Sequence, residues 1–220
     1  MKRFLPFSIV GLFLVFQPIT LLAKLKPDQT SIRSVDFHNF TYPLPDERFL
    51  RLGKKVSVVD GTCDDRSNQM CRAYFHVAEV IYGDLTGDKH EEAVVVTIFG
   101  SACGTYYLTN IYVYSLVNRK PLLLAQLKET KVEADFKKTY KGDEYQLFEA
   151  VENGRLIKDK QLSVSHFTTG AHCCPENVST FRYELRGKKM VLIQNPERVP
   201  NSQEYVKMQA YHERLNYLKF

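Results

Sequence analysis

The residues with the greatest capacity for chemistry lie in one short segment near position 170. Imidazole and thiol groups gather there: His166, His172, Cys173 and Cys174. Imidazole and thiolate ligands suit Zn²⁺ or copper, and an exposed, activated thiolate can act as a nucleophile. The alternative is that the histidines are surface or hydrogen-bonded residues and that the cysteines are structural. A metal- or thiol-dependent activity at this loop is therefore one hypothesis for the function.

A second set of polar residues could bind calcium. Oxygen-bearing side chains stand at positions 1, 3, 5 and 9 of a turn that precedes an apolar run: Asp84, Thr86, Asp88 and Glu92. This spacing resembles the calcium loops of β-propeller and integrin-type repeats, although Thr86 replaces an acid and Lys89 stands where a glycine is usual. We prefer the interpretation that Asp84 and Asp88 close a tight turn by hydrogen bonds to the backbone. We therefore expect no cofactor, with calcium as the alternative.

Several enzyme classes lack their motifs in this sequence. There is no Gly-x-Ser-x-Gly nucleophile elbow, no His-Glu-x-x-His zinc motif and no phosphate-binding loop, and no Cys-x-x-Cys pair. Paired carboxylates of the glycosidase kind cannot be diagnosed from spacing, because they come together only in space. Whether the protein is an enzyme stays open, and we expect that it is not one.

The elements that must position these residues are mostly strands. Alternating apolar residues predict strands over residues 73–82, 106–116 and 122–127. The continuous apolar run 93–99 suits a central strand that is buried on both faces. On the strand 106–116, Ile111 and Val113 should lie on one face and Tyr112 and Tyr114 on the other.

Two hairpins and one helix complete the predicted fold. Asn153-Gly154 is a strong hairpin signal, and Arg186-Gly187-Lys188 predicts a second hairpin. Asn201 followed by Glu204 forms a capping box. Apolar residues then recur at helical spacing: Tyr205, Met208, His212, Leu215 and Leu218. The fold class that we predict is mainly β (α+β), an antiparallel sheet or meander with a C-terminal helix.

The N-terminus has the features of a secretory signal. Met1-Lys2-Arg3 precedes an apolar run over residues 4–16, and Ala23 offers a small residue at the cut. We predict a signal peptide over 1–23, a flexible lead-in over 24–34 and a single globular domain over 35–220. The alternative is that the segment is kept as an anchor. No second long apolar segment follows, so we expect no stable membrane insertion once the signal is removed.

The charge of the exported part excludes one class of partner. The whole chain carries 30 basic and 25 acidic residues, a net charge of +5. Removal of residues 1–23 takes away Lys2 and Arg3 and no acid, which leaves +3. The cations occur only in scattered pairs, such as Lys54-Lys55. We therefore expect no nucleic-acid partner.

The five cysteines predict disulfide bonds in an exported protein: Cys63, Cys71, Cys103, Cys173 and Cys174. Cys63 and Cys71 flank one short polar loop, so we predict that they pair. Cys103 and the Cys173-Cys174 pair each lie between predicted strands, and both turns could lie at one edge of a sheet. We predict that Cys103 pairs with Cys173 or with Cys174 and that the other thiol stays unpaired.

That second bridge would join two loops into one surface. The loops 100–105 and 169–176 are rich in small residues, which allow close approach of backbone or ligand. Tyr106 and Tyr107 follow the first loop, His172 lies in the second, and aromatic residues commonly anchor interfaces. We predict a binding surface with His172 and either Tyr106 or Tyr107 at its rim. The alternative is that the bridge only staples the edge of a sheet.

The order of these motifs resembles one known family. Gly83-Asp84-Leu85-Thr86-Gly87-Asp88 is followed by a Glu-Ala-Val-Val-Val strand, a small-residue cysteine loop and, much later, Cys173-Cys174-Pro175 before an aromatic strand. Over about residues 73–194, this order is similar to that of the LppP/LprE family of bacterial secreted lipoproteins. The resemblance implies a bacterial source and an envelope location, and it carries no known reaction. The lipid-attachment cysteine of that family is missing, which favours a soluble secreted or periplasmic protein.

Taken together, the sequence favours a non-catalytic envelope or extracellular domain that binds a protein, a glycan or a small ligand. The alternative is the metal- or thiol-dependent activity at His166, His172, Cys173 and Cys174. The identity of the envelope or extracellular partner and the oligomeric state are left open.

Overall fold

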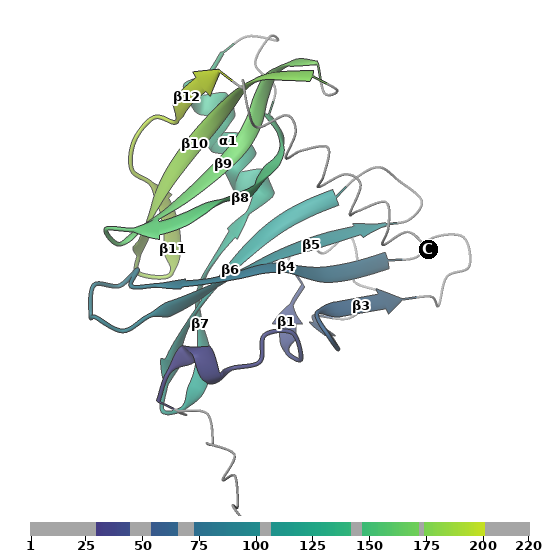
Figure 1. Cartoon of the computed structure of the whole chain (residues 1–220), viewed down its shortest axis with the longest axis vertical. Coiled ribbons are helices and arrows are strands. Elements are labelled where there is room, and N and C mark those ends of the chain that lie inside the picture. Colours follow the sequence, from purple (N-terminus) through teal and green to yellow (C-terminus); the bar gives the residue numbers. More distant parts are fainter. Residues whose placement is uncertain are drawn as a thin grey trace, which may run out of the picture.

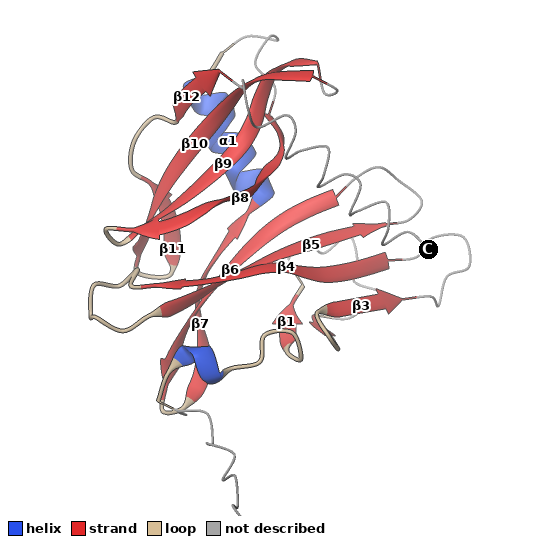
Figure 2. Cartoon of the chain, in the orientation of Figure 1, coloured by secondary structure: helices blue, strands red, loops and turns tan. Residues whose placement is uncertain are grey.

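The computed structural model of this chain describes residues 30–44, 54–65, 73–101, 107–141, 147–171 and 174–200. Strands dominate it, with a short 3₁₀ helix and one α-helix among the described elements (Figure 2). The predicted signal peptide (1–23) and the predicted helix after residue 200 lie outside these residues. The described elements are, in chain order, η1 (Ile32–Ser34), β1 (Thr41–Pro43), β2 (Lys55–Ser57), β3 (Thr62–Asp65), β4 (Ala73–Gly83), β5 (Glu92–Ser101), β6 (Tyr107–Val117), β7 (Lys120–Lys128), α1 (Glu129–Thr139), β8 (Leu147–Lys158), β9 (Gln161–Ala171), β10 (Cys174–Arg186), β11 (Lys189–Leu192) and β12 (Glu197–Pro200).

The central layer is a five-stranded antiparallel sheet in the order β3-β4-β5-β6-β7. Its middle strand, β5, is buried on both faces, because Ala93, Val94, Val95 and Val96 are all 0% exposed. This confirms the prediction of a doubly buried central strand over 93–99. The predicted alternation on β6 is confirmed as well, since Ile111 and Val113 lie on one face and Tyr112 and Tyr114 on the other.

A second antiparallel sheet covers one face of the central sheet. Its order is β11-β10-β9-β8, and β12 pairs with β10. We call the face of the central sheet that it covers the inner face. Val94, Val113 and Leu127 of this face pack against Leu162 and Phe181 of the second sheet. Figure 1 shows the second sheet close to the central sheet at the β8–β9 turn and rising away from it towards the β9–β10 turn.

The opposite, outer face of the central sheet is covered by the N-terminal arm, residues 30–44 with β2. Phe37 and Tyr42 are buried against Phe75, Tyr112 and other residues of this face. The Tyr42 hydroxyl donates to the Phe37 carbonyl. Ile32 is 2% exposed, so the folded part begins before residue 35. The predicted flexible lead-in over 24–34 is therefore wrong for its last residues, because Ile32 finds an apolar surface to bury itself against.

An exposed ion pair ties the arm to the central sheet. The Arg33 guanidinium donates to both carboxylate oxygens of Glu91, at 2.6 and 2.8 Å. The same guanidinium lies 4.4 Å from the centre of the Tyr82 ring, a cation–π arrangement. These contacts place the arm beside the acidic turn.

One predicted hairpin turn is wrong and the other is confirmed. β8 continues through Asn153-Gly154, and the chain reverses at Asp159 and Lys160, whose φ angles are 52° and 64°. The register of β8 against β9 is irregular between Ala150 and Arg155, which absorbs the extra residues. The β10–β11 hairpin turns at Gly187 as predicted, with φ of 60°.

The mainly β, antiparallel fold class is confirmed, but the helix that the structure describes lies among the strands rather than at the C-terminus. α1 buries Val132 and Phe136, four residues apart, against the inner core. Six of its nine other residues are charged. Two apolar positions in a charged segment give a weak helical pattern, which explains why the sequence did not predict this helix.

Candidate functional site

The acidic turn between β4 and β5 is closed by its own carboxylates. The Asp84 carboxylate accepts hydrogen bonds from the backbone N–H groups of Gly87 and of Lys89, the latter at 3.1 Å. Asp88 Oδ1 accepts from the N–H of His90 at 2.8 Å, and this bond lowers the pKa of Asp88. Lys89 adopts a φ of 70°, the left-handed conformation that glycine adopts more easily. These are the backbone hydrogen bonds expected of a turn built on Asp84 and Asp88.

Glu92 anchors the same turn from inside the protein. The residue is 0% exposed. Its Oε2 accepts from the N–H groups of Leu85 and Thr86 at 2.8 and 3.1 Å, while its buried Oε1 has no hydrogen-bond partner. Burial raises the pKa of this carboxyl group. Glu92 therefore holds the first half of the turn against β5.

The geometry of the acidic turn can be compared with the calcium site that its sequence suggests. Three of the four predicted ligands, Asp84, Asp88 and Glu92, direct carboxylate oxygens at backbone N–H groups of the turn. Thr86, the fourth, is exposed. Across the part of the chain that the structure describes, no three His, Cys, Asp or Glu side chains are grouped so that they could hold a metal ion.

Of the predicted histidine and cysteine set, the structure describes His166 on β9 and the backbone of Cys174 on β10. His166 is 2% exposed, and its ring meets Phe181 edge to face at 6.0 Å between ring centres. Cys174, of which the backbone is described, pairs with Ala171, five residues further along β9. That separation is roughly 17 Å along a strand, whereas ligands lie within about 2.3 Å of a zinc ion. His166 therefore does not share a metal with Cys174; His172 and Cys173 lie outside the described residues.

The two cysteine loops belong to different sheets, so the expectation that they share one sheet edge is wrong. The β5–β6 loop ends two strands of the central sheet, and the β9–β10 turn ends two strands of the second sheet. Figure 1 shows these strand ends on the side where the sheets diverge. A bridge from Cys103 to Cys173 or Cys174 stays a prediction, and it would link two layers.

Most of the predicted loop residues themselves are not described. Cys71, Cys103 and Tyr106 lie outside the described residues, and Tyr107 is described by its backbone, which pairs with Gly100. Cys63 is half-buried on β3 opposite Phe75. Within the described residues no disulfide bond is present, and the Cys63–Cys71 bridge stays a prediction.

The structure also brings together polar residues that the sequence did not single out. Along β9 and β10, the inward-facing side chains change from apolar to polar towards the β9–β10 turn. The inward-facing pairs are, in order, Leu162–Tyr183, Val164–Phe181, His166–Ser179 and Thr168–Asn177. His166, Thr168 and Ser179 are each at most 2% exposed. Polar residues at such positions have to find hydrogen-bond partners.

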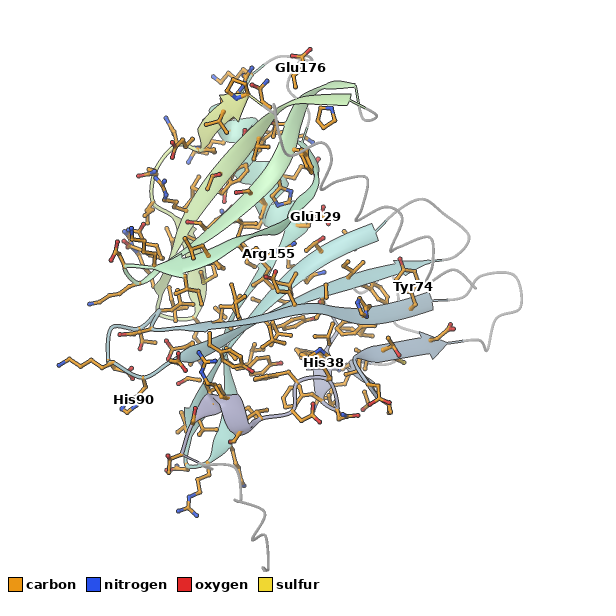
Figure 3. The ribbon with its side chains drawn as sticks, viewed as in Figure 1. His38, Tyr74, His90, Glu129, Arg155 and Glu176 are labelled. Atoms are coloured by element: carbon orange, nitrogen blue, oxygen red, sulfur yellow. The ribbon has the colours of Figure 1, made fainter. Side chains whose placement is uncertain are left out.

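An ion pair between the two sheets lies next to these residues. Arg155 on β8 donates through its terminal guanidinium nitrogen to Glu79 Oε2 on β4, at 3.0 Å. The two side chains are 9% and 20% exposed, and the Arg155 Nε has no hydrogen-bond partner. Figure 3 labels Arg155 between the second sheet and the central sheet. We call Glu79, Arg155, His166, Thr168 and Ser179 the inter-sheet polar region.

The hydroxyl groups of this region are paired. Thr168 Oγ1 and Ser179 Oγ lie 2.9 Å apart. The same two strands carry a second hydroxyl pair on their other face, between Ser165 and Thr180, also at 2.9 Å. On the same strand as Glu79, His76 has a buried Nδ1 without a partner, and burial lowers its pKa. A compensated charge pair, hydroxyls and imidazoles can recognise polar groups by hydrogen bonding.

One sequence signal could have revealed this region. On β9 the inward positions 162 and 164 are apolar, whereas the next two, 166 and 168, are polar. β10 shows the reverse order, with Asn177 and Ser179 before Phe181 and Tyr183. The two patterns coincide only when the register of the hairpin is known, because a shift of one residue moves every side chain to the other face.

In the comparisons with known proteins, no family model, no curated protein and no solved structure matches this chain. In the described residues, none of the helices has the length and apolar character needed to span a membrane.

Proposed function

We propose that this protein is an exported, non-catalytic domain that binds a polar ligand through the inter-sheet polar region. The observation that carries the proposal is the Arg155–Glu79 pair, which lies between two sheets and leaves the buried Arg155 Nε without a partner. An unsatisfied buried donor costs about 1–3 kcal/mol. A carboxylate, carbonyl or hydroxyl oxygen of a ligand would satisfy it.

The neighbouring side chains support a polar ligand rather than an apolar one. Three inward-facing positions, where apolar residues would be usual, carry polar ones: His166, Thr168 and Ser179. Each of these side chains can donate and accept hydrogen bonds. They lie on the half of the β9–β10 hairpin that is nearer its turn, and Figure 1 shows the two sheets diverging towards that turn. Oxygen atoms that can form these hydrogen bonds occur in a glycan, in a small polar molecule and in a peptide backbone. The experiment below distinguishes among these three kinds of ligand.

Export is the second part of the proposal. It is supported by the signal-like N-terminus, by the five cysteines and by the resemblance to the LppP/LprE family. A secreted or periplasmic location gives such a domain access to envelope or extracellular ligands. Non-catalytic binding agrees with the missing enzyme motifs.

The test compares two matched variants on the same pair of strands. Thr168→Val removes the inner hydroxyl pair together with the longer bond from Thr168 Oγ1 to the Asn177 carbonyl at 3.4 Å, and Thr180→Val removes the outer pair. Melting temperatures are measured for the wild type and both variants with neutral and acidic monosaccharides, dicarboxylates and short peptides. We expect at least one probe to raise the melting temperatures of the wild type and of Thr180→Val. The same probe should bind Thr168→Val about fivefold more weakly, which corresponds to about 1 kcal/mol. Equal responses of the two variants, or no response of the wild type to any probe, would contradict the proposal.

A further inference from the structure

The tip of the β6–β7 hairpin combines exposed apolar side chains with cations. Val117 and Leu122 flank the turn and are 45% and 50% exposed. Arg119 and Lys120 are exposed between them. The turn is tight, with φ angles of 50° at Asn118 and 61° at Arg119, so the four side chains project from one small surface. We call these four residues the hairpin tip.

The cations of the hairpin tip lack compensating acids nearby in the chain. No Asp or Glu occurs between residues 93 and 128. Glu91, just before that stretch, is already paired with Arg33. Apolar side chains next to uncompensated cations are the combination that favours the surface of an anionic bilayer.

The hairpin tip also lies where the described chain begins. Ile32 of η1 belongs to the outer core against which Leu116 and Leu123 of the same hairpin pack, and Figure 1 shows η1 beside the lower end of β7. The sequence before residue 30 contains Lys24 and Lys26 and, further back, the apolar run 4–16. A chain that is tethered to a bilayer through that run during export would present this end of the domain to the lipid.

We propose that the hairpin tip docks the exported protein reversibly on the surface of an anionic phospholipid bilayer. The proposal goes beyond ligand binding between the sheets and rests only on the export part of the proposed function. Burial of the exposed parts of Val117 and Leu122 among the headgroups would add to the attraction of Arg119 and Lys120 for anionic lipid. Two short apolar contacts and a few cations give reversible attachment rather than insertion.

The experiment measures cosedimentation of the protein, purified from the exported fraction, with two kinds of vesicle. One kind is pure phosphatidylcholine and the other contains about one third phosphatidylglycerol. The variants are Val117→Ser with Leu122→Ser, and Arg119→Gln with Lys120→Gln. Leu156→Ser is the matched control, because Leu156 is 58% exposed on the second sheet. All of these positions are exposed or half-exposed, and unchanged melting temperatures verify that each variant is folded.

We expect the wild type and Leu156→Ser to bind the anionic vesicles and to bind phosphatidylcholine weakly. The apolar double variant should lose roughly tenfold in affinity, and the charge variant roughly fivefold for each cation removed. Absence of wild-type binding to anionic vesicles, or equal binding by the wild type and both tip variants, would overturn the proposal. Intact mass shows separately whether the protein is exported, so failure of docking is distinguishable from failure of export.

Discussion

Glu92 joins the acidic turn to the buried strand that follows it. Burial raises its pKa from the ordinary value of 4.5, so the folded protein holds this proton more tightly than the unfolded chain. The stability that protonation contributes is therefore present below pH 4.5 and is lost as the pH rises through the folded pKa. His76 has the opposite effect on how stability depends on pH. Its pKa is lowered in the folded protein, so the unfolded chain is protonated first as the pH falls and the folded state loses stability.

The first prediction separates the charge of Glu92 from its hydrogen bonds. Glu92→Gln keeps an acceptor for the N–H groups of Leu85 and Thr86 and removes the buried charge. We expect it to be at least as stable as the wild type at pH 7 and to lack the loss of stability above pH 4.5 that Glu92 contributes. Glu92→Ala should lower the free energy of unfolding by about 2 kcal/mol, because it leaves two donors without an acceptor. Urea unfolding at several pH values measures both, and equal stability of the two variants at pH 7 would refute this role.

The second prediction concerns the exposed side of the turn. Asp84 accepts two backbone hydrogen bonds and Asp88 one. We therefore expect Asp84→Ala to cost about 2 kcal/mol and Asp88→Ala about 1 kcal/mol, and neither cost should depend on calcium. Thermal unfolding with and without millimolar calcium is the check. A melting temperature that calcium raises in the wild type but not in Asp88→Ala would make the turn an ion site.

At the scale of elements, the strands were predictable and the turns less so. Period-two patterns located β4, β6 and β7, and the uninterrupted apolar run located β5, because burial acts directly on these side chains. Asn153-Gly154 gave a wrong prediction of a hairpin turn, because the irregular register of β8 arises from its pairing with β9, which the local sequence does not show. The true turn uses Asp159 and Lys160, which carry no glycine to mark their left-handed backbone.

The N-terminal arm supplies the third prediction. Phe37 is 1% exposed and meets the rings of Phe40 and Tyr114, each at 5.4 Å between ring centres. Phe37→Ala should therefore lower the free energy of unfolding by about 3–5 kcal/mol, as expected for a buried aromatic side chain. Phe40 is partly buried in the same cluster, so Phe40→Ala serves as the control with a smaller loss. Chemical denaturation would contradict a structural role for the arm if both variants matched the wild type.

For the whole molecule, the sequence predicted poorly how the strands divide between the two sheets. The sequence allowed both cysteine loops to lie at one sheet edge, because nothing local distinguishes strands of one sheet from strands of two. It also missed the Arg155–Glu79 pair, whose members are 76 residues apart and meet only when the sheets stack. The residues of the acidic turn were found because they are neighbours in sequence.

Both proposed activities require export of the protein, and one measurement tests export most directly: the intact mass of the protein recovered from the envelope fraction or the medium. We predict a mature chain that begins at or near Lys24. Its mass should be two hydrogens lower for each disulfide bond, with Cys63 joined to Cys71, Cys103 joined to Cys173 or Cys174, and one thiol left to react. A chain that keeps Met1, stays in the cytoplasm and carries five reduced cysteines would contradict the account.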